Sequence, residues 1–282
     1  SFVPLRKVPE IEALEKRATV EQRILQQPND VDVIGKLSSY IKETVCVTRD
    51  VVARRLREKR AYAKCQEVIE AGSKDMAHIY EAVWTMLQNT EKAQIRKYRQ
   101  MMQTLNLQDE TSTNAANRQK FEGVLENYTA AAAIKPAFDA FVTSLVQSMT
   151  TVELHNPYAL KRVQRIVEKT QFRPDDPGNA NRVCDVVRAM IVCRHFEDIT
   201  KIVEGILTSD RVRVTRVKNR FADGHESAGG WRDVMINFYI RKDVEGTVSD
   251  RHLLAHQICE IQCVHKRMLT ARRGLPGHSI YA

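Results

Sequence analysis

Residues 258–264 read ICEIQCV, and this short stretch decides how the second half of the chain is interpreted. Apolar residues and cysteines surround one acidic residue, Glu260, in a run that is typical of a buried strand. An acidic side chain within such a strand is costly unless it faces a site, a metal ion or a cation. Glu260 is therefore either a functional carboxylate or the partner of a strand arginine such as Arg213 or Arg216.

The segments around this strand follow a regular order. Apolar or alternating runs predict further strands at 189–193, 211–221 and 234–240, and helical spacing predicts helices at 196–207 and at 266–273, ending at Gly274. The order is strand, helix, strand, strand, strand, helix. It predicts a mixed sheet with helices on it, an α+β domain that spans residues 156–282.

The first half has the periodicity of helices. Residues 1–29 contain three prolines and predict an extended arm with one short helix. From residue 30, helical spacing predicts long helices over about 30–70, 74–105 and 115–150, the last interrupted near Pro136. Short connections between long amphipathic helices favour antiparallel packing, so residues 30–155 are predicted to form a helical bundle.

Composition excludes several classes of protein. With 43% hydrophobic and 28% charged residues, the 282-residue chain can bury a core. No run of 18 consecutive apolar residues occurs, so we expect no membrane span. Six cysteines without a CxxC pair disfavour a disulfide scaffold and a thiolate zinc site, and the histidines lack zinc-ligand spacing. We expect a reducing, intracellular compartment, either mitochondrial or cytoplasmic.

The formal charge of +9 is concentrated from residue 156 onward, where 22 Lys and Arg stand against 15 Asp and Glu. This excess indicates an anionic ligand: a nucleotide, a nucleic acid or an acidic protein. One hypothesis is RNA binding by a basic strand face, with Arg211, Arg213, Arg216 and Arg220. Two basic helical runs, at 54–64 and 92–99, favour solvated helix faces over nucleic-acid or membrane contacts.

Four further residues are candidates for chemistry. Asp185 precedes the first strand, and together with Glu260 it offers the two carboxylates that a Mg²⁺-nucleotide site needs. Lys161 and Lys169 lie eight apart on a predicted helix, so both can face one phosphate-bearing cleft, although solvated lysines are the commoner case. Trp231 follows two glycines and is either a surface for base stacking or an ordinary core residue.

Taken together, several segments of the second half resemble the RelA/SpoT-type nucleotidyltransferase domain of alarmone synthetases, in the divergent version found in larger proteins of algae and protists. The resemblance extends from about Leu160 to Ala282. It rests on the order of the segments RVCDVVRAMIVC (182–193), RVKNRF (216–221), GGWRDVMINF (229–238), HQICEIQ (256–262) and KRM (266–268).

The resemblance implies a function and roles for particular residues. Active members transfer pyrophosphate from ATP to the 3′ oxygen of GDP or GTP with Mg²⁺. It implies that Asp185 and Glu260 are the Mg²⁺ ligands and catalytic carboxylates. It further implies that Lys161 and Lys169 bind phosphate, that Lys218 opens the loop over the site, and that Trp231 stacks on guanine.

Some positions depart from the pattern of the family. Ala159 and Met190 stand where arginines are expected, Asn219 replaces an aspartate, and Met235 replaces a histidine. These losses disfavour efficient transfer of pyrophosphate. We therefore expect a degenerate domain, a pseudoenzyme, that acts as a nucleotide-binding or scaffold subunit of a larger assembly. We expect it to contact protein partners through its N-terminal helices. The alternatives are an active Mg²⁺-dependent pyrophosphokinase and an RNA-binding protein.

Overall fold

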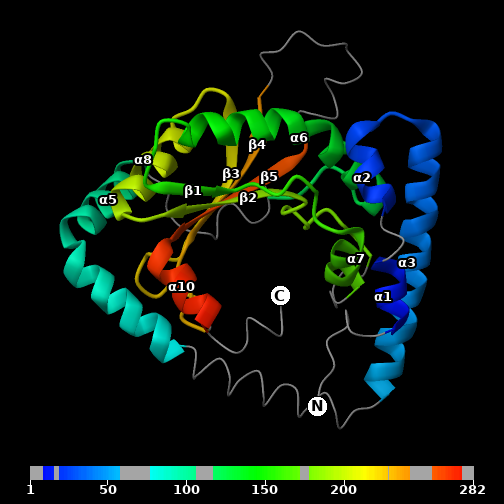
Figure 1. Ribbon diagram of the computed structural model, residues 1–282, viewed down its shortest axis with the longest axis horizontal. Helices are drawn as coiled ribbons and strands as arrows, with labels where there is room; N and C mark the ends of the chain where they lie inside the picture. The colour runs from blue at the N-terminus through cyan, green and yellow to red at the C-terminus, as the bar shows by residue number, and fades with distance from the viewer. Residues whose placement is uncertain are drawn as a thin grey trace.

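A five-stranded mixed sheet with the strand order β1-β2-β5-β4-β3 lies at the centre of the protein (Figure 1). The computed structural model describes residues 9–15, 19–57, 77–105, 117–171, 178–227, 229–241 and 256–274. β2 and β5 are parallel, and every other neighbouring pair is antiparallel. The strands are β1 (Val152–His155), β2 (Val187–Cys193), β3 (Val212–Asn219), β4 (Val234–Ile240) and β5 (Ile258–His265).

Helices surround this sheet. In the first half they are α1 (Pro9–Glu15), α2 (Thr19–Gln26), α3 (Val31–Arg57), a helix at 77–90, α5 (Lys92–Thr104) and α6 (Val124–Val146). In the second half they are α7 (Val163–Gln171), α8 (Phe196–Leu207) and α10 (Lys266–Gly274). The α+β class and the predicted order of strands and helices in the second half are confirmed. The part of the predicted helix that follows residue 57 lies outside the described residues.

Four predictions about the first half differ from the structure. The helix predicted over 74–105 is two helices, one at 77–90 and α5, which meet at Glu91. The short helix predicted in the arm is two helices, α1 and α2. The helix predicted to begin at residue 115 begins at Val124, because residues 117–123 run beside the loop at 180–181 and bond to its backbone. Pro136 does not interrupt α6, since it lies on the exposed side of that helix.

β1 was not predicted at all. It has only four residues, too few for an alternating pattern to stand out, and it lies before the predicted boundary at residue 156. Its pairing with β2 adds residues of the first half to the sheet.

The two faces of the sheet differ in chemistry because side chains alternate along each strand. One face is apolar and includes Ala189, Ile191, Ile236, Phe238 and Ile261. The opposite face carries most of the polar and charged strand residues. Each strand therefore contributes to the core and to a polar surface at the same time.

The helices of the first half pack on this apolar face and on later helices. α6 crosses the sheet, with the rings of Phe138 and Phe141 at 6.2 and 5.6 Å from that of Phe238 (Figure 1). α3 packs mainly on α7, and α5 packs mainly on α8. Buried residues of the predicted bundle and of the sheet form one continuous core. α6 is long and apolar enough to cross a membrane, but core helices of other proteins often have the same length and composition. Many of the apolar residues of α6 are buried inside this protein.

An aromatic cluster joins the helix at 77–90 and α5 to the second half. Phe196, at the start of α8, lies at the centre of the cluster, with its ring 4.9 Å from Phe221, 5.8 Å from Tyr98 and 5.9 Å from Trp84. All four side chains are almost completely buried. The cluster therefore couples the two halves through packing.

Replacing Phe196 with alanine should lower the free energy of unfolding by about 3–5 kcal/mol, because it leaves a cavity where both halves meet. Tyr158→Ala is the control, since Tyr158 is 70% exposed, and its effect should stay below about 0.5 kcal/mol. Denaturant unfolding of both variants measures the difference. Equal effects would show that the cluster does not join the halves.

A buried glutamate–histidine contact lies next to this cluster. Glu91, between the helix at 77–90 and α5, accepts a hydrogen bond from the backbone N–H of Phe196 (2.7 Å) and contacts His265 Nε2 at 3.1 Å. The backbone N–H of Arg267 donates to His265 Nδ1 at 3.2 Å, so Nε2 carries the proton that is given to Glu91. Burial lowers the pKa of His265, and Glu91 offsets only part of that effect.

This pKa shift predicts a loss of stability in mild acid. Because the pKa of His265 is lower in the folded state, the unfolded chain binds more protons below about pH 6.5, the ordinary value for histidine. The free energy of unfolding should therefore fall as the pH drops below about 6.5, by at most about 1.4 kcal/mol per pH unit. Unfolding measured between pH 7.5 and 5.5 should show a smaller slope for His265→Gln and the wild-type slope for His155→Gln, a matched change at an exposed histidine. Identical slopes in all three proteins would contradict this assignment.

Candidate functional site

A row of polar side chains crosses four strands on the polar face of the sheet. The pairing register places Arg188 of β2 beside Glu260 of β5, Glu260 beside Asn237 of β4, and Asn237 beside Arg216 of β3. Neighbouring positions across strands lie about 5 Å apart, so these side chains share one surface. The chain thus places a carboxylate at the middle of the sheet between an amide and arginines.

Glu260 is buried, and its contacts differ from the predicted structural alternative. Its Oε2 accepts a hydrogen bond from Asn237 Nδ2 at 3.3 Å, and Arg216 Nε donates to Asn237 Oδ1 at 3.0 Å. No ion pair joins Glu260 to Arg213 or Arg216, all three of which lie in the described part of the chain. Burial and the nearby Asp185 carboxylate raise the pKa of Glu260. The carboxylate is therefore oriented by an amide but not neutralised by a direct partner.

Asp185 gathers both predicted lysines. Lys169 Nζ lies 2.9 Å from Asp185 Oδ2, Lys161 Nζ also bonds that oxygen, and Arg188 lies at 3.7 Å. Burial raises the pKa of Asp185, but Lys161 and Lys169 lower it by more, so it lies below its usual range. Burial lowers the pKa of Lys161 to about 8, against the opposing charge of Asp185. One carboxylate oxygen thus holds two ammonium groups together.

The two lysines reach Asp185 from different local structures. Lys169 is on α7 as predicted, but Lys161 lies two residues before that helix. Its backbone N–H donates to the carbonyl of Val186 at 3.0 Å, and this extended pairing brings it beside the start of β2. The prediction that the two lysines lie two turns apart on one helix is wrong, because Lys161 precedes α7. They are brought together instead by their shared contact with Asp185.

The carboxylates provide a partial ligand set for a divalent cation. Asp185 Oδ1 is buried and accepts no hydrogen bond from the described residues. Repulsion from Asp185 contributes to the raised pKa of Glu260, and a cation between the two carboxylates would remove it. The described residues contain no group of three or more His, Cys, Asp or Glu that could hold a metal ion. Two carboxylates leave most positions around a Mg²⁺ ion open, so these residues fit Mg²⁺ only together with phosphate oxygens and water as further ligands.

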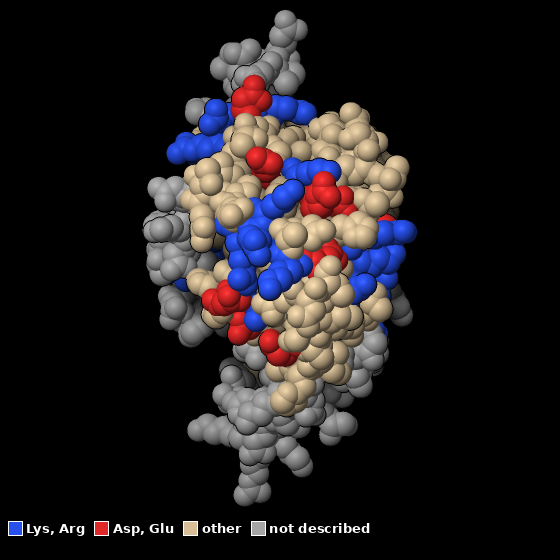
Figure 2. Space-filling view, turned by 90° about the vertical axis from the view of Figure 1, so that its left-hand side faces the viewer, with Lys and Arg blue, Asp and Glu red and all other residues tan. Residues whose placement is uncertain are grey.

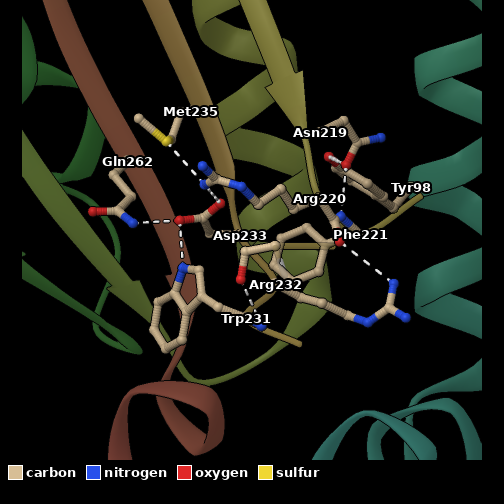
Figure 3. A network of polar contacts seen from close by, with 10 residues as sticks. Tyr98, Asn219, Arg220, Phe221, Trp231, Arg232, Asp233, Met235 and Gln262 are labelled. Carbon is tan, nitrogen blue, oxygen red and sulfur yellow. Dashed lines mark hydrogen bonds and ion pairs between the residues drawn. The ribbon is translucent and has the colours of Figure 1, made fainter. Parts of the chain in front are cut away.

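Asp233 is the centre of a second cluster, which the sequence did not single out (Figure 3). Its carboxylate is fully buried and accepts hydrogen bonds from Arg220 Nη1 (2.6 Å), Trp231 Nε1 (2.7 Å) and Gln262 Nε2. Gln262 lies two residues after Glu260 on the same face of β5. The second cluster is thus connected to the first through β5.

The predicted stacking residue, Trp231, has contacts on its ring. The ring of Tyr80 lies 5.5 Å away in an edge-on arrangement, and the guanidinium of Arg272 on α10 lies 4.9 Å from the indole centre. Gly230 has a positive φ of 78°, and a Cβ there would come within 3.2 Å of the backbone of Ala77. The glycine therefore allows the loop to approach the helix at 77–90 closely. In this arrangement, the indole of Trp231 is held by protein groups.

The remaining basic residues occupy several surfaces. Lys218 lies on the polar face, opposite Met235 in the register of β3 and β4. The four arginines of the RNA hypothesis do not act together: Arg211 lies over the ring of Phe141 on α6, Arg216 bonds Asn237, and Arg220 bonds Asp233. Arg211 and Arg213 are exposed, whereas Arg216 and Arg220 are partly buried.

Acidic residues accompany the basic run of α5. The side of the molecule on which α5 and α8 lie shows Lys and Arg with Asp and Glu among them (Figure 2). Arg99 pairs with Asp223 at 2.9 Å, and Lys201 pairs with Glu197 at 2.8 Å. This arrangement agrees with the interpretation of residues 92–99 as a solvated helix face.

Comparisons with known proteins concern the fold. No family model matches the sequence, and no similar sequence was found among curated proteins. The solved small alarmone synthetase 1 of Bacillus subtilis is 18% identical and aligns over 55% of this chain and 77% of that chain, with a TM-score of 0.39. Small alarmone synthetase 2 of the same organism is 16% identical over 54% and 76%, with a TM-score of 0.41. A GTP pyrophosphokinase family protein of Streptococcus pneumoniae is 14% identical over 54% and 71%, with a TM-score of 0.35. These structures come from the family that the segments of the second half resemble.

The Asp233 cluster predicts that neutralising this one carboxylate lowers the stability of the protein considerably. Asp233→Asn should lower the free energy of unfolding by about 3 kcal/mol, because it leaves the half-buried Arg220 without its counter-charge. The matched control is Asp223→Asn, which removes a solvent-exposed partner of Arg99 and should cost less than about 1 kcal/mol. Denaturant unfolding at pH 7 measures both, and equal costs would contradict the central role of Asp233.

Proposed function

We propose that the polar face of the sheet binds a magnesium complex of a nucleoside polyphosphate, as a nucleotide-binding RelA/SpoT-like domain. The observation that carries this proposal is the convergence of Lys161 and Lys169 on Asp185, next to the buried carboxylate of Glu260. Two ammonium groups at one point supply the charge that phosphate oxygens require. Arg188 lies at the edge of the same group.

The electrostatics favour binding of metal and phosphate together. Mg²⁺ alone would approach Asp185 against the charges of two lysines, which weakens its binding. Phosphate oxygens would offer the lysines a second anionic partner, and Asp185 and Glu260 are the residues that would hold the Mg²⁺ ion. When bound, the metal neutralises phosphate charge. Lys161 and Lys169 orient the phosphates, and Asn237 holds Glu260 toward the same point.

The same site is proposed to bind without efficient transfer of pyrophosphate. Asn219, at a position where the family resemblance implies an acidic group, accepts hydrogen bonds from the hydroxyl of Tyr98 (3.0 Å) and the backbone N–H of Phe221 (3.2 Å), so its amide serves the fold. Gln262 and Trp231 are both engaged by Asp233. These contacts support a pseudoenzyme over an active pyrophosphokinase, which is the second candidate.

Other aspects of function stay predictions from the sequence. We still predict that the protein belongs to a larger assembly, that protein partners contact its N-terminal helices, and that it is mitochondrial or cytoplasmic. RNA binding has less support, because three of its four arginines are committed to Ser144, Asn237 and Asp233.

Calorimetric titration with Mg²⁺ and GTP, GDP or ATP tests nucleotide binding. The solved small alarmone synthetase 1 of Bacillus subtilis was bound to its product pppGpp, so pppGpp is a further ligand to test.

Lys169→Ala should weaken binding at least about tenfold, the value expected for one charge-assisted hydrogen bond. Glu260→Gln should reduce the dependence of the Kd on Mg²⁺. The matched control is Glu153→Gln, a half-exposed glutamate of β1 paired with Lys266, which should leave the Kd unchanged.

Transfer of label from γ-labelled ATP to GDP or GTP, measured with the same proteins, separates the two candidates. Nucleotide binding without labelled product supports the pseudoenzyme. Product from the wild type that disappears in Glu260→Gln would establish the active enzyme. The absence of any nucleotide binding would sink both.

A further inference from the structure

The first turn of α7 depends on a residue far away in the sequence. Val163, the first residue of α7, donates its backbone N–H to Glu21 Oε1 of α2 at 2.7 Å, across 142 positions of the chain. The first N–H groups of a helix have no partner within the helix, and a carboxylate there also interacts favourably with the helix dipole. Glu21 is buried, so this contact is shielded from solvent. It therefore acts as a cap supplied by another helix.

The last turn of α7 is also held by the first half. Arg49 of α3 donates from Nε to the side-chain oxygen of Gln171, the last residue of α7, at 2.9 Å. Between these two ends α3 packs along α7, and Figure 1 shows α3, α2 and α7 together on one side of the molecule. α2 and α3 therefore determine the position of α7 at both of its ends.

α7 is the helix that brings lysines to the candidate site. Lys169 lies in its last turn, and Lys161 lies just before its first residue. Both ammonium groups bond Asp185 Oδ2. A shift of α7 would therefore move Lys169 relative to Asp185 and Glu260, and a shift of its first turn would displace the backbone two residues after Lys161, which also pairs with Val186.

We propose that Glu21 is a positioning residue for the nucleotide site, acting through α7, so that the N-terminal helices are part of that site. This inference rests on the proposed nucleotide function. Glu21 itself touches no ligand. Its carboxylate holds the N–H of Val163 at the start of α7. α7 carries Lys169, and Val163 lies two residues after Lys161, whose other anchor is its pairing with Val186.

The chain contains a matched control for this inference. Glu91 is likewise a buried glutamate of the first half that caps a helix of the second half, since it accepts the N–H of Phe196 at the start of α8. The elements that Glu91 joins, α8 and the end of β5, carry neither Lys161 nor Lys169. Glu21→Gln and Glu91→Gln are therefore the same chemical change at two long-range helix caps. Only Glu21 caps the helix that carries Lys169 and follows Lys161.

The experiment compares nucleotide affinity, helix protection and lysine reactivity in the full chain. In Glu21→Gln the Kd for Mg²⁺-GTP should rise at least about fivefold, while in Glu91→Gln it should stay within about twofold. Hydrogen exchange of residues 163–171 should accelerate in Glu21→Gln only. Acetylation of Lys161, whose side chain is 7% exposed, should also increase in that variant only. Glu21→Asp, which keeps the charge on a shorter side chain, should recover part of the lost affinity.

Each outcome decides the inference. If both variants lose stability but Glu21→Gln keeps the wild-type Kd and the wild-type reactivity of Lys161, Glu21 is only structural and the inference is wrong. If the wild type binds no nucleotide, the proposed function fails. Hydrogen exchange of α7 and acetylation of Lys161 then still decide whether Glu21 positions the lysines. If Glu21→Gln does not fold, Arg49→Ala, which removes an exposed contact at the other end of α7, tests the same dependence and should raise the reactivity of Lys169.

Discussion

The carboxylate of Glu260 lies buried in the central strand of a five-stranded sheet, and the neighbouring polar groups of that face compensate for its loss of contact with water. A buried charge without a partner is far less stable than the same charge in water, so its neighbours must compensate. Asn237 supplies a hydrogen bond, while Lys169 and Arg216 act through their charges. The compensation is incomplete, as the raised pKa of Glu260 shows. An incompletely compensated carboxylate beside the orphaned Oδ1 of Asp185 is a place where a cation would gain energy.

The first half of the chain completes this arrangement. Two buried glutamates, Glu21 and Glu91, each cap a helix of the second half, and the aromatic cluster around Phe196 adds apolar contact between the halves. Backbone N–H groups at a helix start are always available to such a carboxylate, whatever the local sequence. The first half is therefore joined to the second through helix ends and aromatic packing, and of the two glutamates only Glu21 caps the helix that carries Lys169.

Asp233 has a different effect on the same face. By accepting hydrogen bonds from Arg220, Trp231 and Gln262, it ties together three groups that a ligand would otherwise meet. Arg272 of α10 adds a contact on the indole of Trp231. The groups at this end of the face are thus engaged with one another, whereas the proposed binding of Mg²⁺ and nucleotide rests on Lys161, Lys169, Asp185 and Glu260.

The sequence by itself determined the α+β class, the boundaries of β4 and α8, and the acidic residue inside β5, because each follows from periodicity or composition over a few neighbouring residues. It also indicated Asp185, Glu260, Lys161 and Lys169 as candidates. Only the tertiary structure decided that both lysines bond Asp185, that Glu260 lies near enough to feel the charge of Asp185, that β1 joins the sheet, and that Asp233 accepts hydrogen bonds from three side chains. Each of those features depends on contacts between residues far apart in the chain, such as Glu21 with Val163, and local patterns carry no information about which distant partner a carboxylate will find.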